Sequence, residues 1–180
     1  ESKSSEITVI SVTLSSRRSQ NIRIRDISSP IPDIVVGKTV VQQEVEGNVV
    51  LSDLERLVGK IQISLSEVPQ DVSSISVEMD GFYDCVSLDG IYSLSGGEPL
   101  KKTISLVREG DVWKAADILF PSVPSASGLT LKFIVRAASG TDTYLVNFAE
   151  GIVAGKVASL VAKAGELLTK GSLSMSFTYT

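Results

Sequence analysis

Apolar and polar side chains alternate along most of this chain, and this period of two constrains the fold more than any other sequence feature. Successive side chains of a β-strand point to opposite faces of a sheet, so alternation marks strands with one face on a core and one in water. The C-terminus is the clearest case, because Leu173, Met175, Phe177 and Tyr179 alternate with serines and threonines. We predict further strands over 7–14, 22–27, 35–45, 60–68, 75–79, 82–88, 103–108, 115–120, 129–138 and 143–148.

Turn-forming residues separate these segments, as a fold made of many short strands requires. The Gly110-Asp111 pair predicts a hairpin between 103–108 and 115–120. With 180 residues, of which 43% are apolar and 21% charged, the chain is long and apolar enough to bury one core. We therefore predict a mainly β protein, an antiparallel β-sandwich that forms a single domain over 1–180, with 1–6 as a flexible tether.

Two segments depart from the period of two. Ser52 and Glu55 have the spacing of a capping box, in which both side chains satisfy free amide groups at a helix start, and Gly59 suits a helix end. This spacing predicts a short helix over 53–59. Over 152–168 the apolar residues fall on one helical face, so an amphipathic helix is the better prediction there. The glycines and valines of that segment leave a strand pair, bending at the glycines, as the alternative.

The sequence offers no residue constellation for catalysis, so we expect no enzyme, no cofactor and no metal. It contains no histidine, which removes the usual general base and the usual zinc ligand. Segment 151–157 resembles a phosphate-binding loop, but it has three residues between its glycines where that loop needs four. Glu78, Asp80, Asp84 and Asp89 collect near turns, and solvated turns explain them better than a calcium site or a glycosidase pair does.

Charge and hydropathy exclude two classes of partner. The net charge is −4 and no basic patch is present, so we expect no nucleic acid. No apolar run reaches the ~18 residues that a membrane helix needs, so we expect no transmembrane segment. The single cysteine, Cys85, excludes an internal disulfide, and we predict a buried thiol. The chain opens on a polar stretch without a signal peptide, so an exported protein of this sequence would have lost its leader.

The aromatic residues raise a second candidate function. Trp113, Tyr83 and Tyr92 would be the glycan contacts of a non-catalytic carbohydrate-binding module in a surface glycan-uptake system, because sugars stack on exposed rings. Aromatic residues make up only 6% of the chain. Trp113 also follows a turn and precedes an alternating strand, which favours a place in the core or at its rim. Glycan binding is therefore the alternative function.

A family resemblance points to the leading candidate. The segment Leu54-Glu55-Arg56-Leu57-Val58-Gly59-Lys60, an expected short helix with an arginine, runs into an alternating strand and is followed by 72–79 and 82–94. Over roughly 50–148 the chain resembles the fimbrillins and fimbrillin anchors of Bacteroides-type bacteria, the proteins of type V pili. The resemblance implies a transthyretin-like, Ig-like sandwich, export as an outer-membrane lipoprotein, removal of an N-terminal strand after a basic residue, and polymerisation by strand addition. The chain departs from the family in its length, since members commonly have two sandwich domains, and in lacking a lipid-bearing cysteine at its start.

On this resemblance we expect a secreted, cell-surface adhesion protein, a pilus-type structural subunit or anchor. The terminal strand would add to a sheet edge of a neighbouring subunit, with Leu173, Met175, Phe177 and Tyr179 as the anchors. Arg17 and Arg18, just after the first predicted strand, would be the processing site. The expected partners are other pilus or surface subunits, including second copies of this chain, and a host or glycan receptor. The plain alternatives are an ordinary turn at the arginines and a terminal strand that pairs only within its own domain.

Overall fold

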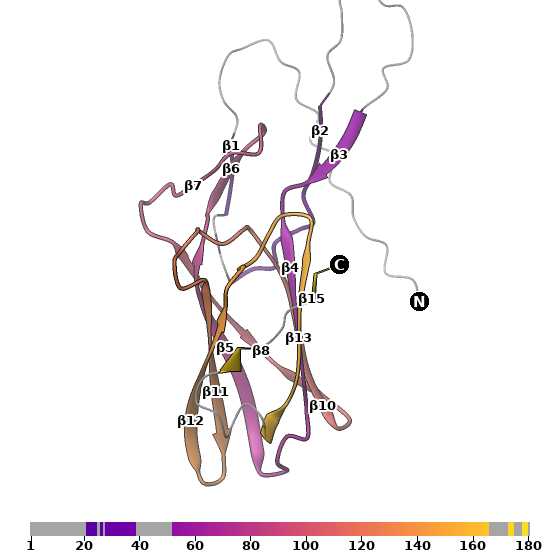
Figure 1. The fold of residues 1–180 in the computed structure, drawn as a ribbon, viewed down its shortest axis with the longest axis vertical. Helices are drawn as coiled ribbons and strands as arrows, with labels where there is room; N and C mark the ends of the chain where they lie inside the picture. Colours follow the sequence, from indigo (N-terminus) through magenta and orange to yellow (C-terminus); the bar gives the residue numbers. More distant parts are fainter. Residues whose placement is uncertain are drawn as a thin grey trace, which may run out of the picture.

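The computed structural model describes residues 21–24, 26, 28–38, 52–165, 173–174 and 178–179. These residues form two sheets of five strands, one sheet of three and one of two. The two larger sheets run side by side along the long axis of the molecule. The two smaller sheets lie beyond one end of these larger sheets (Figure 1). The prediction of a mainly β protein with predominantly antiparallel sheets is confirmed.

The first five-stranded sheet follows the order β14-β12-β11-β5-β8. Its neighbours pair antiparallel except β12 and β14, which run parallel. The bounds of its strands are Leu173–Ser174 (β14), Gly140–Phe148 (β12), Leu129–Ala137 (β11), Val72–Phe82 (β5) and Leu100–Ser105 (β8). The predicted strands over 75–79, 129–138 and 143–148 are confirmed here, and the first half of 103–108 lies in β8.

The second five-stranded sheet follows the order β15-β13-β4-β10-β9. Its strands are Thr178–Tyr179 (β15), Val157–Lys163 (β13), Gly59–Ser66 (β4), Val112–Leu119 (β10) and Val107–Glu109 (β9). β13 runs parallel to β4, and the other neighbours are antiparallel. The predicted turn at Gly110-Asp111 is confirmed, because Glu109 pairs with Val112 on either side of it. The first strand of this hairpin is β9, however, and 103–105 pairs with β5 in the other large sheet.

The two large sheets bury their inner faces in one apolar core. Buried and exposed residues alternate along the strands as the period of two requires, most regularly in β4 and in the first half of β11. The largest buried side chains come from both sheets: Phe82, Phe133, Ile61, Ile63, Leu65, Met79, Leu119, Leu131 and Leu160. Burial of this set from two facing layers is what stabilises the body of the molecule.

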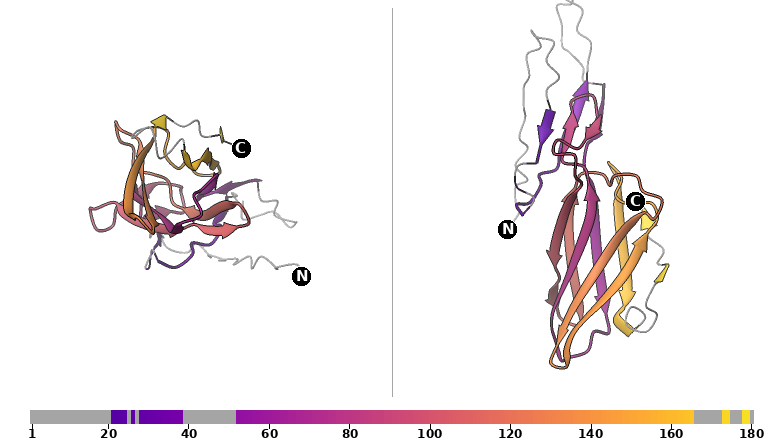
Figure 2. Two further views of the ribbon diagram at one scale, coloured as in Figure 1. Left: turned by 90° about the horizontal axis from the view of Figure 1, so that it is seen from below. Right: turned by 90° about the vertical axis from the view of Figure 1, so that its left-hand side faces the viewer.

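The remaining strands form a second, smaller cluster beyond one end of this core. β1 (Asn21–Arg23), β6 (Cys85–Ser87) and β7 (Tyr92–Ser93) form one sheet, and β2 (Val35–Lys38) and β3 (Ser52–Arg56) form the other (Figure 2). The buried members of the cluster are Ile31, Leu57, Val58, Val86 and Phe120. Cys85 is buried as a free thiol, as predicted.

The helix predicted over 53–59 is wrong. Ser52–Arg56 is strand β3, and its backbone pairs with β2, with Glu55 opposite Val36. A capping box satisfies the amides of one helix end, whereas the ladder with β2 satisfies amides along the whole segment. Gly59 ends no helix and begins β4, where a Cβ atom would lie 2.5 Å from the Val153 carbonyl oxygen. The glycine there allows two backbones to approach each other.

The helix predicted over 152–168 is also wrong for its described part. Val157–Lys163 is strand β13, in which Ala158, Leu160 and Ala162 are buried while Val161 is 77% exposed. Only Ala164 and Gly165 at the end of this range take a helical hydrogen-bond pattern. The parallel ladder with β4 outweighs the helical spacing of the apolar residues. In the part of the chain that the structure describes, no helix has the length and hydropathy of a membrane span.

Candidate functional site

The C-terminal segment, the predicted interaction strand, joins both large sheets on the same side of the molecule. β14 pairs with β12, with Leu173 opposite Val146, and β15 pairs with β13, with Tyr179 opposite Ala158. The two described parts of the predicted strand therefore belong to two different sheets. Met175 and Phe177, the two middle anchors, lie outside the described residues. Each described attachment consists of two residue pairs.

Trp113 belongs to the core. Its side chain is 7% exposed and lies in the apolar cluster shared by the two large sheets. On β10 it alternates with exposed Lys114, as an inward-facing residue does. The expectation of a place in the core or at its rim is confirmed.

Tyr83 and Tyr92 are brought together, but away from Trp113. Their ring centroids are 5.7 Å apart, and Tyr92 also makes an edge contact with Phe120 at 6.3 Å. The Tyr92 hydroxyl donates to the Leu57 carbonyl at 2.9 Å. Burial, followed by the charge of Glu55, raises the pKa of Tyr92 above its ordinary value. The two half-buried tyrosines pack against the smaller cluster, whereas Trp113 belongs to the core of the two large sheets.

The predicted processing site, Arg17 and Arg18, lies outside the described residues. The chain that follows it docks on β6 through Asp84. The Ile24 amide donates to the Asp84 carbonyl at 2.9 Å, and Arg23 Nε lies 3.6 Å from the Asp84 carboxylate. The described N-terminal strand β1 is thus held by three antiparallel residue pairs and one ion pair.

Asp84 is buried and well supplied with donors. The Ser95 amide donates to its carboxylate at 2.7 Å, and the Ser95 hydroxyl donates to the other oxygen. Burial alone would raise the pKa of Asp84, but the Ser95 hydrogen bonds and the charge of Arg23 outweigh it, so the pKa lies below its ordinary value. Asp84 therefore ties β1, β6 and the loop at Ser95 together.

The acidic residues near the turns do not converge. Glu78 pairs with Lys132 at 2.8 Å and Asp80 with Lys101 at 2.6 Å, each across neighbouring strands, while Asp84 bonds to Ser95. No group of three or more potential metal ligands occurs among the described residues. Cross-strand pairing explains Glu78 and Asp80 in the same way as it explains other charges on a sheet surface.

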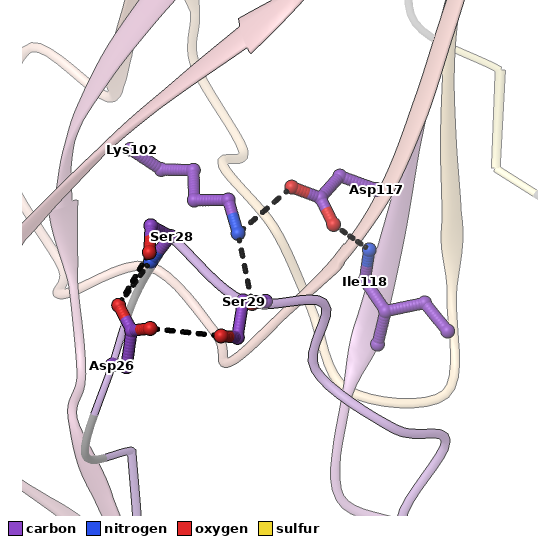
Figure 3. Close-up of polar contacts among 6 residues, drawn as sticks. All are labelled: Asp26, Ser28, Ser29, Lys102, Asp117 and Ile118. Atoms are coloured by element: carbon purple, nitrogen blue, oxygen red, sulfur yellow. Dashed lines mark hydrogen bonds and ion pairs between the residues drawn. The ribbon is translucent and has the colours of Figure 1, made fainter.

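A buried charge pair at the other side of the molecule was not found by sequence reasoning. Lys102 on β8 and Asp117 on β10 point inward from the two large sheets, and Lys102 Nζ lies 3.3 Å from Asp117 Oδ2 (Figure 3). Their side chains are only 6% and 15% exposed. Lys102 Nζ also donates to the Ser29 carbonyl at 3.3 Å, and the Ile118 amide donates to Asp117 Oδ1 at 2.9 Å.

The Ser29 carbonyl that contacts Lys102 belongs to a tight turn at Ser28 and Ser29. The Asp26 carboxylate accepts from the Ser28 amide at 2.9 Å and from the Ser29 hydroxyl at 2.8 Å (Figure 3). The Ser28 and Ser29 hydroxyls, with the Ser28 amide, lower the pKa of Asp26, and the charge of Lys102 adds to the effect. Two residues on, Ile31 is buried in the smaller cluster. The segment before β2 therefore lies against the facing edges of both large sheets.

The outer face of the second sheet is hollowed into an open groove. One register row crosses it, formed by Val107, Lys114, Ser64 and Val161 on four neighbouring strands. Val107 and Val161, at the two ends of the row, are 63% and 77% exposed. Between them lie Ser64 and Lys114, and Lys114 pairs with Glu109 at 2.8 Å.

Comparison with known proteins gives structural likenesses only, because no protein-family model and no curated protein matches the chain. A candidate cell adhesion protein of Bacteroides uniformis superposes on 89% of the chain with a TM-score of 0.49 at 16% identity. A candidate cell adhesion protein of Bacteroides ovatus superposes on 73% with a TM-score of 0.46 at 13% identity. A candidate adhesin of Bacteroides ovatus superposes on 87% with a TM-score of 0.38 at 15% identity. The matched regions span 70%, 46% and 62% of these three chains. At such scores the likenesses decide neither the type of sandwich nor the function.

Proposed function

We propose that this chain is a non-catalytic structural subunit of a bacterial surface, of the adhesion or pilus type, built as a transthyretin-like sandwich. It acts by strand pairing and protein-protein contact with other subunits, including copies of itself. Leu173, Met175, Phe177 and Tyr179 are the anchors of the pairing strand. Arg17 and Arg18 are the site of its processing, and the subunit is held at the cell surface as a lipoprotein.

The observation that supports this proposal is the pairing of the C-terminal segment with both large sheets. β14 pairs with β12 and β15 pairs with β13, so the described parts of the C-terminal segment lie at edges of both large sheets. Backbone hydrogen bonds at a sheet edge do not depend on which copy of a chain supplies the strand. The same segment from a second copy can therefore take the same positions, and alternating apolar residues give it a register.

Truncation after Gly171 tests the proposal. We expect the shortened chain to remain folded, with its urea midpoint little changed, and to sediment as a monomer at concentrations where the full chain assembles. The matched control replaces Thr178 and Thr180 by serine, which keeps the strand and should keep assembly. Unfolding of the truncated monomer, or assembly as strong as that of the full chain, would contradict the proposal.

A further inference from the structure

The Lys102–Asp117 pair joins two sheets that share no described hydrogen-bonded strand pair at this side. β8 is the last described strand of its sheet, and β10 lies next to the last one of the other sheet. Lys102 is on the same face of its strand as buried Ile104, and Asp117 is on the same face as buried Trp113 and Leu119. Each charged side chain thus has residues of the apolar core as its neighbours on the same face of its strand.

The contacts of this pair are long for a buried ion pair. Charge-assisted hydrogen bonds between nitrogen and carboxylate oxygen usually measure about 2.7–2.9 Å. Lys102 Nζ lies 3.3 Å from Asp117 Oδ2 and 3.3 Å from the Ser29 carbonyl oxygen. Two charges removed from water in this way regain only part of their hydration energy. Transfer of one proton from Nζ to the carboxylate leaves a neutral amine beside a neutral carboxylic acid, and these are the forms that condense to an amide.

We propose that Lys102 and Asp117 form an intramolecular isopeptide bond. The Nζ lone pair attacks Asp117 Cγ, the new N–C bond forms, and the bond from Cγ to Oδ2 breaks. The departing oxygen takes two of the three ammonium protons and leaves as water, while the third stays on the amide nitrogen. An ammonium and a carboxylate thus become one neutral amide and one water molecule, with no oxidant, nucleotide or other co-reactant.

The surroundings hold the two groups in a reactive arrangement. The Ile118 amide donates to Asp117 Oδ1, the oxygen that the amide retains, and polarises the carbonyl that Nζ attacks. The Ser29 carbonyl, on the turn that Asp26 organises, accepts a second hydrogen bond from Nζ. Free amines and carboxylates rarely meet in dilute water, but groups held in contact react within one molecule, with effective molarities that reach about 10⁵–10⁸ M.

The bond would hold the two large sheets together where no hydrogen-bonded strand pair is described between them. It would link β8 of one large sheet to β10 of the other and close a covalent ring through the corner between them. A chain with one cysteine has no disulfide available for such a link within itself. The inference goes beyond the proposed function and does not depend on it, because the bond would form whether or not copies of the chain assemble.

The mass of the full chain, denatured and intact, tests the proposal. We expect it to be lighter than the sequence mass by one water molecule, with a trypsin digest that leaves Lys102 uncut and joins the peptides that carry Lys102 and Asp117. The matched control Lys102→Arg keeps a positive charge beside Asp117 but cannot form the amide, so it should have its full sequence mass. A full sequence mass for the unmutated chain would overturn the proposal. So would a missing water that fragmentation places at Asp80-Gly81 or Asp89-Gly90, where a cyclic imide also forms by loss of water.

Discussion

Replacing Trp113 by alanine separates a core role from glycan binding. An aromatic side chain buries about 150–250 Å² at about 25 cal/mol per Å², a transfer contribution of about 4–6 kcal/mol. Trp113 is 7% exposed, so nearly all of that area becomes exposed to water when the protein unfolds. Truncation of buried aromatic residues costs about 3–5 kcal/mol, and we expect a loss of about 4 kcal/mol for Trp113→Ala.

Urea unfolding followed by far-ultraviolet circular dichroism measures this loss. With a slope near ~2 kcal/mol per M, the midpoint should fall by about 2 M. Lys114→Ala is the control on the same strand, and its exposed pair with Glu109 should contribute at most about 1 kcal/mol. A Trp113→Ala protein of unchanged midpoint that loses binding on a glycan array would refute the core assignment and favour the carbohydrate-binding alternative.

Three further predictions rest on single residues. Gly128 and Gly110 both have positive φ, but an added Cβ at Gly128 would lie 2.4 Å from the Phe148 carbonyl oxygen and at Gly110 would meet nothing within 4 Å. Gly110→Ala should therefore lose about 1 kcal/mol of unfolding free energy and Gly128→Ala at least about 2 kcal/mol more; equal losses would contradict the close approach. Because the pKa of Asp84 is lowered on folding, its stabilisation is present above about pH 4 and is lost as the pH falls through its folded value. The difference in unfolding free energy between the unmutated chain and Asp84→Asn should thus shrink as the pH is lowered from 7 to 3. A difference that grows would contradict the lowered pKa. Lys132→Ala breaks the half-exposed pair with Glu78 and should lower the unfolding free energy by at most about 1 kcal/mol in the same assay. A loss several times larger would mean that the pair is shielded from water.

Most strands were predictable because their burial follows a period of two. In β4, Ile61, Ile63 and Leu65 are buried and the residues between them are more exposed, as the sequence pattern indicates. Local turn chemistry was equally informative at Gly110-Asp111, where a turn joins two paired strands as expected. Both signals act between residues that are near in sequence, so one chain is enough to show them.

The two predicted helices show where local pattern fails. Helical spacing counts Val161 with the buried residues of its segment, yet Val161 is 77% exposed on the outer face of β13. The deciding contact is the parallel ladder with β4, about a hundred residues earlier in the chain, and nothing in the segment itself announces that partner. At Glu55 the capping spacing is real, but β2 offers a competing ladder.

The candidate sites divide in the same way. Alternation predicts that the C-terminal segment pairs at a sheet edge, but it does not show that β14 and β15 belong to different sheets. The Lys102–Asp117 pair was missed although alternation places both residues on the inner faces of their strands. A lysine at an inward position interrupts the apolar pattern. Its partner Asp117 lies on a strand of the other sheet, so the pair can be recognised only once the packing of the two sheets is known.

Exchange of the C-terminal segment between copies is measured most directly by disulfide trapping. Asn147 lies opposite Ser174 in the pairing of β12 with β14, at a strand spacing that suits a disulfide. In a Cys85→Ala background, chains carrying Asn147→Cys are mixed with chains carrying Ser174→Cys, each purified separately, and the mixture is oxidised. If copies exchange the segment, we expect disulfide-linked pairs with one chain of each kind. Bonds that form only inside a chain carrying both cysteines, and none in the mixture, would contradict it.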